Sequence, residues 1–302
     1  MTTSTGKGSI VVVTGASTGI GASTARALSR HGFHVLAGVR RAGDGDTLRA
    51  NGIEPVILDI TEPTQVQALA ARIAADPRPL HALVNNAGIQ VNGPVETLPM
   101  AQWRRVFDVN LFGHVAITQT LLPALLRSEG RVINISSIGG KLAMPTYGAY
   151  AGAKFALEAV SDALRREVSP LGVEVVVIQP GGVRTQMAAR GVATANHLAA
   201  QMTSDQETRY GGLVQAVNSL MDSGTASGVT SELAARVIVK AVMTPRPRTR
   251  YTVGRDAALL IRLARVLPDR ALDHLSARSL RSHHPRTPTV GVLSRLRVGV
   301  SS

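Results

Sequence analysis

Short runs of β-branched and aliphatic residues alternate with longer segments in which apolar side chains recur every three or four positions. The runs are typical of buried strands, and we expect strands over 9–13, 34–39, 54–58, 82–85, 131–136 and 174–179. The longer segments predict helices over 19–31, 64–75, 100–127 and 150–168, with Pro123 expected to kink or end the third. This repeating order predicts an α/β fold with a doubly wound parallel sheet.

After Pro180 the periodicity weakens. Residues 186–230 combine small, polar and flexible apolar residues with little strand character, which favours a lid over an active site. A helix is expected from Ser231 to about Met243, because Ser231 precedes Glu232 and an apolar run. We therefore expect a flexible N-terminus over 1–8, one catalytic domain over 9–254, and a C-terminal extension over 255–302 that is partly disordered beyond about Ser282.

The basic charge is concentrated in that extension. The net charge is +13, but residues 245–302 carry twelve Arg against three Asp, which leaves +4 for the rest. A solvated basic surface and attraction to anionic membrane lipids both fit, since the segment 256–267 combines Arg262 and Arg265 with apolar residues. No nucleic-acid partner is expected, because the tail has one aromatic residue, Tyr251, and no recognisable binding module.

Composition narrows the setting. Aromatic residues make up only 3% of the chain, so the core must rest on aliphatic side chains. The absence of cysteine excludes disulfides and thiolate metal sites, and no metal is expected. The first ten residues lack the apolar core of a secretory signal, and no run reaches the roughly 18 apolar residues of a membrane span. We expect a cytoplasmic protein, either soluble or at the periphery of a membrane.

A glycine-rich turn joins the first strand to the first helix. Gly15, Gly19 and Gly21, spaced Gly-x-x-x-Gly-x-Gly, let the backbone turn sharply and approach a ligand closely. The helix start that follows favours a pyrophosphate group. Taken alone, the turn fits a glycine-rich connection without a ligand as well.

Three further segments follow in order: Asn85-Asn86-Ala87-Gly88, Tyr150-Ala-Gly-Ala-Lys154 and Pro180-Gly181-Gly182-Val183-Arg184-Thr185. With the turn, they resemble the short-chain dehydrogenase/reductase family from residue 9 to about 185. The stretch 247–254 and the sequence Leu267-Pro268-Asp269-Arg270 resemble its hydroxysteroid- and retinol-dehydrogenase-like branch. The resemblance implies a Rossmann-type fold, usually with seven parallel strands, and a nicotinamide-dependent oxidoreductase acting on alcohols and carbonyl compounds.

Tyr150 and Lys154 share one face of the helix over 150–168. A nearby ammonium lowers the pKa of a phenol, which suits a general acid and base, although an exposed pair on a solvated helix is the alternative. The resemblance implies that Ser137 binds the substrate oxygen, with Ser136 as the competing serine, and that Asn110 supports a proton-relay water. Tyr147 lacks a Lys four residues on and is assigned to the substrate pocket or to packing.

The end of the strand over 34–39 bears on the cofactor. Val39 stands where NAD-preferring relatives often carry Asp, and Arg40 suits a 2′-phosphate. However, Thr18 stands where many NADP-preferring relatives carry Lys or Arg. We expect NADP(H), with NAD(H) as the open alternative. The residues expected to bind the cofactor are Gly15, Ser17, Thr18, Gly19, Ile20, Gly21, Arg40, Asp59, Asn86, Ala87, Gly88, Tyr150, Lys154, Pro180, Gly181, Val183 and Thr185.

Met187 and other flexible apolar residues of the lid favour a lipophilic alcohol or ketone, such as a steroid or retinoid, although ordinary lid packing explains them equally. Ser137, Tyr147, Tyr150 and Met187 are the expected substrate contacts. The resemblance also implies a homodimer or homotetramer formed through the helices over 100–127 and 150–168. Two other functions stay open: a catalytically inactive nucleotide-sensing regulatory protein, and an epimerase or dehydratase.

Overall fold

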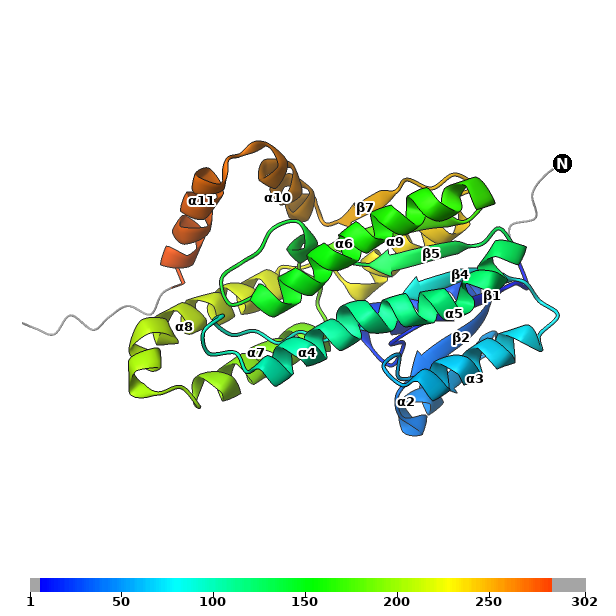
Figure 1. The fold of residues 1–302 in the computed structure, drawn as a ribbon, viewed down its shortest axis with the longest axis horizontal. Helices are drawn as coiled ribbons and strands as arrows, with labels where there is room; N and C mark the ends of the chain where they lie inside the picture. The colour runs from blue at the N-terminus through cyan, green and yellow to red at the C-terminus, as the bar shows by residue number, and fades with distance from the viewer. Residues whose placement is uncertain (1–5, 284–302) are drawn as a thin grey trace, which may run out of the picture.

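The computed structural model describes residues 6–283, which are built around a parallel sheet of seven strands (Figure 1). Neighbouring strands all run parallel, in the order β3-β2-β1-β4-β5-β6-β7. The strands are β1 (Ile10–Val13), β2 (His34–Val39), β3 (Ile53–Ile57), β4 (Leu80–Asn85), β5 (Arg131–Ile135), β6 (Glu174–Pro180) and β7 (Arg250–Val253). The strand order reverses at β1, which pairs with both β2 and β4, and this confirms the predicted doubly wound fold.

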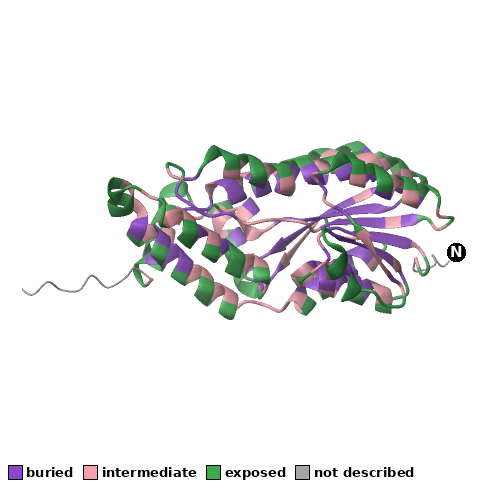
Figure 2. Ribbon diagram, turned by 90° about the horizontal axis from the view of Figure 1, so that it is seen from below, coloured by how far each residue is buried: buried purple, intermediate pink, exposed green. Residues whose placement is uncertain are grey.

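Helices cover both faces of the sheet, which explains why the strands read as continuous apolar runs. Successive residues of β1 divide between the two cores: Val11 and Val13 join one, Ile10 and Val12 the other. Figure 2 shows buried strands between helices whose outer faces are exposed. The first core contains residues of α1 (Gly19–Arg30) and α9 (Ser231–Met243), and the second contains residues of α3 (Pro63–Ala74), α5 (Gly113–Arg127) and α6 (Gly148–Val168).

The strands predicted from the sequence are all present, with ends that differ by at most two residues. β7 is not among them, because only Val253 of its residues is buried and the apolar pattern is weak. The short helix α2 (Ala42–Asp46) is likewise not predicted.

The helix predicted over 100–127 contains a π-helical turn. α4 (Met100–Phe107) leads into η1 (Asp108–Phe112), and α5 follows without a gap. The expected end at Pro123 is not found, since α5 continues to Arg127. Pro123 lies on the exposed side of α5, and so does Gln119, whose carbonyl loses its helical partner and can turn to water. Within residues 6–283 this helical stretch is long and apolar enough to span a bilayer, but Ile117, Leu121 and Leu125 of α5 belong to the core beside the sheet.

Two helices form the segment that the sequence predicts as a lid. α7 (Gln186–Ala199) and α8 (Ser204–Ala226) pack against each other, and Thr203 opens α8 with a capping box completed by Gln206. Beyond β7, α10 (Arg255–Val266) and α11 (Asp269–Arg281) project from the body of the molecule (Figure 1). The mobility of the lid stays a prediction, and the predicted disorder of the tail falls on residues 284–302, outside the described residues.

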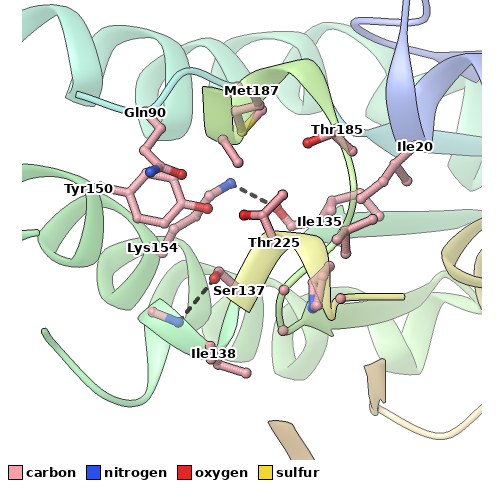
Figure 3. Close-up of a pocket in the computed structure, with 18 of the residues that line it drawn as sticks. Ile20, Gln90, Ile135, Ser137, Ile138, Tyr150, Lys154, Thr185, Met187 and Thr225 are labelled. Carbon is pink, nitrogen blue, oxygen red and sulfur yellow. Dashed lines mark hydrogen bonds between the residues drawn. The ribbon is translucent and has the colours of Figure 1, made fainter. Parts of the chain in front are cut away.

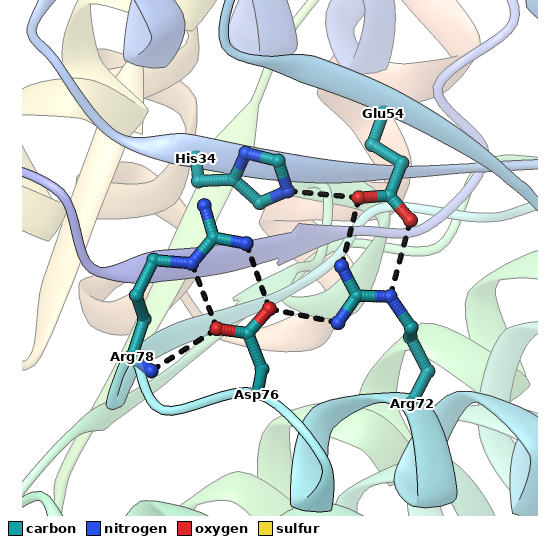
Figure 4. Close-up of polar contacts among 5 residues, drawn as sticks. All are labelled: His34, Glu54, Arg72, Asp76 and Arg78. Atoms are coloured by element: carbon teal, nitrogen blue, oxygen red, sulfur yellow. Dashed lines mark hydrogen bonds and ion pairs between the residues drawn. The ribbon is translucent and has the colours of Figure 1, made fainter.

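Five ionisable side chains form a network at the amino ends of the strands (Figure 4). Arg72 of α3 joins two carboxylates, with nitrogen–oxygen distances of 2.9 Å to Glu54 and 2.7 Å to Asp76. His34 contacts Glu54 at 2.9 Å, and Arg78 contacts Asp76 at 2.7 Å. Because a doubly wound sheet binds ligands at the opposite, carboxyl edge, we interpret this network as structural.

Candidate active site

The turn between β1 and α1 is locked to the segment that follows β4. Gly15 has a φ of +63°, and a Cβ atom there would lie 2.7 Å from the Cα of Ala87. The Thr14 hydroxyl accepts hydrogen bonds from the backbone N–H groups of Asn86 and Ala87, both at 2.9 Å. The Asn86 amide in turn donates to the carbonyl oxygens of Thr14 and Gly15, at 2.9 and 3.0 Å. Only glycine permits this close approach, so two motifs that are far apart in sequence form one wall of a cavity.

The segment after β6 closes on the same turn. Thr185 is the N-cap of α7, and its Cγ2 would lie 3.1 Å from a Cβ atom placed on Gly19. Val183 forms an isolated β-bridge with Val229, which fixes the path of the chain between β6 and α7. The predicted Pro180-to-Thr185 segment therefore faces the glycine turn across the carboxyl edge of the sheet.

Two neighbouring arginines that follow β2 differ in their ion pairing. Arg41 forms an ion pair with Asp44 at 3.1 Å, whereas Arg40 lines the cavity and makes no ion pair within residues 6–283. Asp59, which follows β3, accepts hydrogen bonds from the N–H and hydroxyl of Thr61, at 3.0 and 2.7 Å. Arg40 is thus the cation that is available to an anionic group in this part of the cavity.

Asn110 lies in the π-helical turn η1 and is completely buried. Its amide donates to the carbonyl oxygen of Ile89 and its own oxygen accepts from the Ile89 N–H, each at 2.8 Å. These two bonds hold the backbone that follows Gly88. The proton-relay role implied for Asn110 stays a prediction.

Ser137 follows β5 and begins the 3₁₀ turn η2 (Ile138–Gly140), where its Oγ accepts a hydrogen bond of 3.0 Å from the Gly139 N–H. Gly139 also packs closely on the catalytic candidate, since a Cβ there would lie 3.3 Å from Cε1 of Tyr150. The competing Ser136 is buried, and its Oγ would lie 2.7 Å from a Cβ on Gly140. Ser137 therefore begins the turn that packs on the ring of Tyr150.

Tyr150 and Lys154 project from the first turns of α6 toward the space that Ser137 faces (Figure 3). The Lys154 ammonium lies 6.0 Å from the centre of the Tyr150 ring and donates a 2.8 Å hydrogen bond to the carbonyl oxygen of Ile135. Burial lowers the pKa of Lys154 to about 8, and the negative charge of Glu158 opposes this lowering.

The lowered pKa that the sequence predicts for Tyr150 is not found. Burial raises the pKa of the phenol, and a hydrogen bond with Ser137 only partly offsets that effect. The ammonium of Lys154 is directed at the backbone of β5, so it stabilises the phenolate less than a direct contact would. In this structure Tyr150 is a protonated phenol, which is the form that donates a proton.

Tyr147 serves as a wall of the same space. Its ring meets that of Tyr150 edge to face, with centroids 6.1 Å apart, and its hydroxyl accepts a 3.0 Å hydrogen bond from the Gln90 amide. Burial raises the pKa of the Tyr147 phenol, which makes Tyr147 a poor candidate for the proton donor. Its assignment to the substrate pocket or to packing stays a prediction.

Three residues near the site have no counterpart among the predicted residues: Gln90, His114 and Glu158. His114 lies one helical turn after Asn110 and bonds the carbonyl oxygen of Ala87 through Nε2 at 2.7 Å. Burial, with a smaller effect from Lys154, lowers its pKa to about 3, so the imidazole is neutral. The spacing of four residues between Asn110 and His114 is the sequence signal that could have identified His114, because residues four apart share one face of a helix.

One cavity of about 1470 Å³ joins these elements. Of the predicted site residues, only Gly21 and Asn110 do not line it. Gly21 serves packing instead, since a Cβ there would lie 2.5 Å from the Asn86 amide nitrogen. Asn110 lies behind Ile89, which it holds.

The cavity extends well beyond Ser137, Tyr150 and Lys154. The far part of the cavity lies among α8, α10 and α11, three of the helices that follow β6. Most of the side chains there are apolar, among them Met144, Leu220, Met221, Leu260, Leu263, Leu272 and Leu275. The same helices also contribute polar residues to the lining: Thr225, Arg255, Asp256, Ser276 and Ser279. Met187 of α7 lines the cavity near the segment that follows β4, since its Cε would be 3.6 Å from a Cβ on Gly88.

Comparison with known families gives a match to the short chain dehydrogenase family over residues 9–196. The chain is 35% identical to the "Uncharacterized oxidoreductase YbbO" of Escherichia coli strain K12, over 88% of this chain and 93% of that protein. It is 31% identical to the NADPH-dependent 3-dehydrocapnine reductase of Ornithobacterium rhinotracheale, over 89% and 96%. It is 34% identical to retinol dehydrogenase 5 of Mus musculus, over 87% and 86%.

Solved structures agree on the fold. A short-chain dehydrogenase from Burkholderia cenocepacia in complex with NADP superposes with a TM-score of 0.70 at 24% identity, covering 91% of this chain and 98% of that one. A short-chain dehydrogenase/reductase from Burkholderia phymatum in complex with NAD gives a TM-score of 0.73 at 23% identity, with 93% and 98% covered.

Proposed function

The chain belongs to the short-chain dehydrogenase family, and from this premise we propose that it interconverts an alcohol and its carbonyl compound with Tyr150 as general acid and base. The observation that carries the proposal is the convergence of Tyr150, Ser137 and Lys154 on one side of a cavity whose other wall is the glycine turn. A protein that only binds nucleotides has no need of a buried phenol, hydroxyl and ammonium around one point. The family acts with a nicotinamide cofactor, and the start of α1, where Thr18, Gly19 and Ile20 line the cavity, fits a pyrophosphate cradle.

When bound, the nicotinamide supplies or accepts the hydride at the substrate carbon. Tyr150 donates its phenolic proton to the carbonyl oxygen during reduction and takes the hydroxyl proton back during oxidation. The Ser137 oxygen accepts the Gly139 N–H, and its O–H, which bonds Tyr150 in this structure, can donate to the same substrate oxygen when substrate is bound. Lys154 places positive charge near the phenol, where negative charge develops as the proton leaves.

We propose NADP(H) as the preferred cofactor. Arg40 lines the cavity without an ion-pair partner within residues 6–283, whereas Arg41 is paired with Asp44. A guanidinium that is not committed to a carboxylate can bind a 2′-phosphate through two parallel hydrogen bonds. One relative is named as NADPH-dependent, and one solved neighbour was crystallised with NADP and another with NAD.

The substrate that we propose is lipophilic. The far part of the cavity is formed mostly by apolar side chains of α8, α10 and α11, and binding there removes apolar surface from water. A steroid- or retinoid-sized alcohol or ketone could place its oxygen at Tyr150 and its hydrocarbon among Leu220, Leu263 and Leu272. The name of the relative retinol dehydrogenase 5 is in accord with this class.

Self-association is a further part of the proposal. Phe112 of η1 is 57% exposed and Phe155 of α6 is 43% exposed, and the two elements pack against each other. Large aromatic side chains left in water on neighbouring elements favour burial against a second copy. We propose a homodimer or homotetramer formed through this face.

Contact with a membrane surface is proposed for α10. Arg255, Leu259, Arg262 and Val266 follow each other at intervals of three or four residues and are all exposed, which gives one stripe of mixed basic and apolar side chains. Sedimentation with vesicles rich in phosphatidylglycerol, weakened by Arg262→Glu, is expected. Equal sedimentation of that variant and the unaltered protein would contradict the proposal.

The test of the reaction is a substrate panel. Purified protein is assayed with NADPH and NADH against steroid, retinoid and short aliphatic carbonyl compounds. Turnover of a lipophilic ketone or aldehyde with NADPH is expected. Tight nucleotide binding without turnover of any compound would favour the nucleotide-sensing alternative.

A further inference from the structure

Glu158 is a buried carboxylate one helical turn after Lys154, and the proposed reaction does not use it. Glu158 is 2% exposed. It accepts hydrogen bonds from the Gln179 amide at 2.8 Å and from Arg250 Nε at 2.9 Å, and Lys141 Nζ lies 3.0 Å away. These partners come from β6, from β7 and from the end of η2. Removing one partner from such a buried cluster is costly, because it leaves an uncompensated charge, so the cluster is a fixed point of the structure.

The contact with Lys141 ties this fixed point to the catalytic serine. Lys141 closes the turn that begins at Ser137, with its N–H bonded to the carbonyl oxygen of Ile138 at 2.9 Å. The Gly140 N–H is bonded to the carbonyl oxygen of Ser137 at 3.0 Å. The turn is therefore a short rigid unit, and Lys141 anchors its far end to Glu158.

The turn also lies directly on α6. A Cβ atom on Gly140 would lie 3.0 Å from the carbonyl oxygen of Lys154 and 3.1 Å from Cγ of Glu158. Contacts of this length leave no room for a side chain. Tyr150 and Glu158 both belong to α6. The distance between Ser137 and Tyr150 therefore depends on how the turn that begins at Ser137 packs against Glu158.

Charge gives Glu158 a second link to the site. Among the ionisable groups around Lys154, Tyr150 is a protonated phenol and His114 of α5 is a neutral imidazole. Lys141 and Arg250 are cations bound to Glu158 itself, and Arg250 also reaches Asp162 at 2.9 Å. Glu158 is the carboxylate whose charge acts on Lys154 to keep its ammonium form.

We propose that Glu158 is a positioning residue for the hydride-transfer site: through Lys141 it seats the turn that carries Ser137, and from the next turn of α6 it keeps a negative charge beside the Lys154 ammonium. The inference rests on the proposed function for its catalytic meaning. The two links it describes can be measured without turnover.

The first experiment follows the lysine directly. The chain has four lysines, Lys7, Lys141, Lys154 and Lys240, so NMR of ¹³C- and ¹⁵N-labelled lysine gives few signals, and Lys154→Arg assigns the one of interest. Glu158→Gln keeps the size and the hydrogen-bond acceptor but removes the charge. We expect it to lower the titration midpoint of Lys154 by about one pH unit, while Lys7 and Lys240 stay unchanged.

Asp162→Asn is the matched control. It removes a carboxylate from the same Arg250, but within residues 6–283 Asp162 makes no ion pair or hydrogen bond with Lys141 or Gln179, and it lies one turn further from Lys154. The control should leave the Lys154 midpoint in place. An unmoved midpoint in Glu158→Gln, or an equal fall in both variants, would overturn the charge link.

Lys141→Met separates the two links. It breaks the anchor of the Ser137 turn without removing a negative charge, so the Lys154 midpoint should not fall. In the substrate assay we expect kcat to fall about tenfold in both Lys141→Met and Glu158→Gln, with KM for NADPH changed less than twofold. Normal kcat in Lys141→Met would refute the anchoring role, and that variant also decides the matter if Glu158→Gln fails to fold.

The outcome is distinguishable from failure of the proposed function. If the unaltered protein turns over no alcohol or carbonyl compound but Glu158→Gln moves the Lys154 midpoint, the proposed reaction fails and the electrostatic link stands. If turnover depends on Tyr150 but neither variant alters kcat or the midpoint, the inference fails and the proposed reaction stands.

Discussion

The ammonium of Lys154 donates a 2.8 Å hydrogen bond to the carbonyl oxygen of Ile135, the last residue of β5. Ile135 stands two residues before Ser137. The side chain of Lys154 on α6 is therefore hydrogen-bonded to β5, the strand that Ser137 follows. This bond crosses from the helix to the sheet and sets both groups relative to Tyr150. The geometry of the site is thus a property of the contact between α6 and β5.

Loss of the Tyr150 hydroxyl should remove turnover. In Tyr150→Phe the ring still packs on Gly139, but no group donates the proton, and we expect kcat to fall by about 10³ with NADPH affinity retained. The measurement is steady-state kinetics together with NADPH titration by fluorescence. Tyr147→Phe, which loses only the bond from Gln90, should keep kcat within a fewfold; a similar loss in both variants would contradict the assignment.

Arg40 should decide the choice of cofactor. In Arg40→Ala we expect KM for NADPH to rise about 30-fold, because a charge-assisted bidentate contact is lost, while KM for NADH changes little. Arg41→Ala is the control, since Arg41 is already paired with Asp44. Parallel changes for the two cofactors would show that Arg40 does not read the 2′-phosphate.

The apolar far part of the cavity should discriminate by substrate length. Leu272→Arg places a charge among leucines, and we expect KM for a steroid-sized ketone to rise about tenfold or more with little effect on a short aliphatic aldehyde. Leu259→Arg is the control, because Leu259 is 59% exposed and does not line the cavity. An equal effect on short and long substrates would place the substrate elsewhere.

Exposed phenylalanines should mark the face of self-association. Phe155→Arg introduces charge where the ring would be buried, and we expect a lower molar mass by light scattering. Leu171→Arg changes a comparably exposed apolar residue of η3 (Ser169–Leu171) and should leave the mass unchanged. A monomeric unaltered protein would also refute the proposed assembly.

The ion network at the other edge of the sheet should make stability depend on pH. Hydrogen bonds from Arg78, opposed by burial and aided by Arg72, hold the pKa of Asp76 well below its usual range. Asp76 therefore contributes stability that is present above the ordinary carboxyl pKa of about 4 and is lost as the pH falls toward its folded value. Asp76→Asn should lower the free energy of unfolding by about 1 kcal/mol at pH 7, measured by urea unfolding.

That difference between the unaltered protein and Asp76→Asn should narrow between about pH 5 and pH 3. Asp222→Asn is the control, because Asp222 is exposed on α8 and makes no ion pair within the described part of the chain. A constant difference across this pH range would show that the charge of Asp76 does not stabilise the fold.

The sequence by itself determined the sheet and most of the candidate catalytic residues. Buried parallel strands must be apolar throughout, so 34–39 and 174–179 are visible as runs without knowledge of their partners. The glycines of the turn are visible because no other residue type tolerates a φ of +63° beside another backbone. Tyr150 and Lys154 are visible because their spacing of four residues is a local property of one helix.

Only the tertiary structure decided which groups these residues meet. Glu158 bonds Lys141, Gln179 and Arg250, which come from three other elements, and no local pattern distinguishes it from a solvated glutamate on α6. The choice between Arg40 and Arg41 likewise depended on Asp44, and the direction of the Lys154 ammonium on β5. Periodicity reports which face of an element is buried, but the partner of a buried polar group is set by how separate elements pack, and that information is spread over the whole chain.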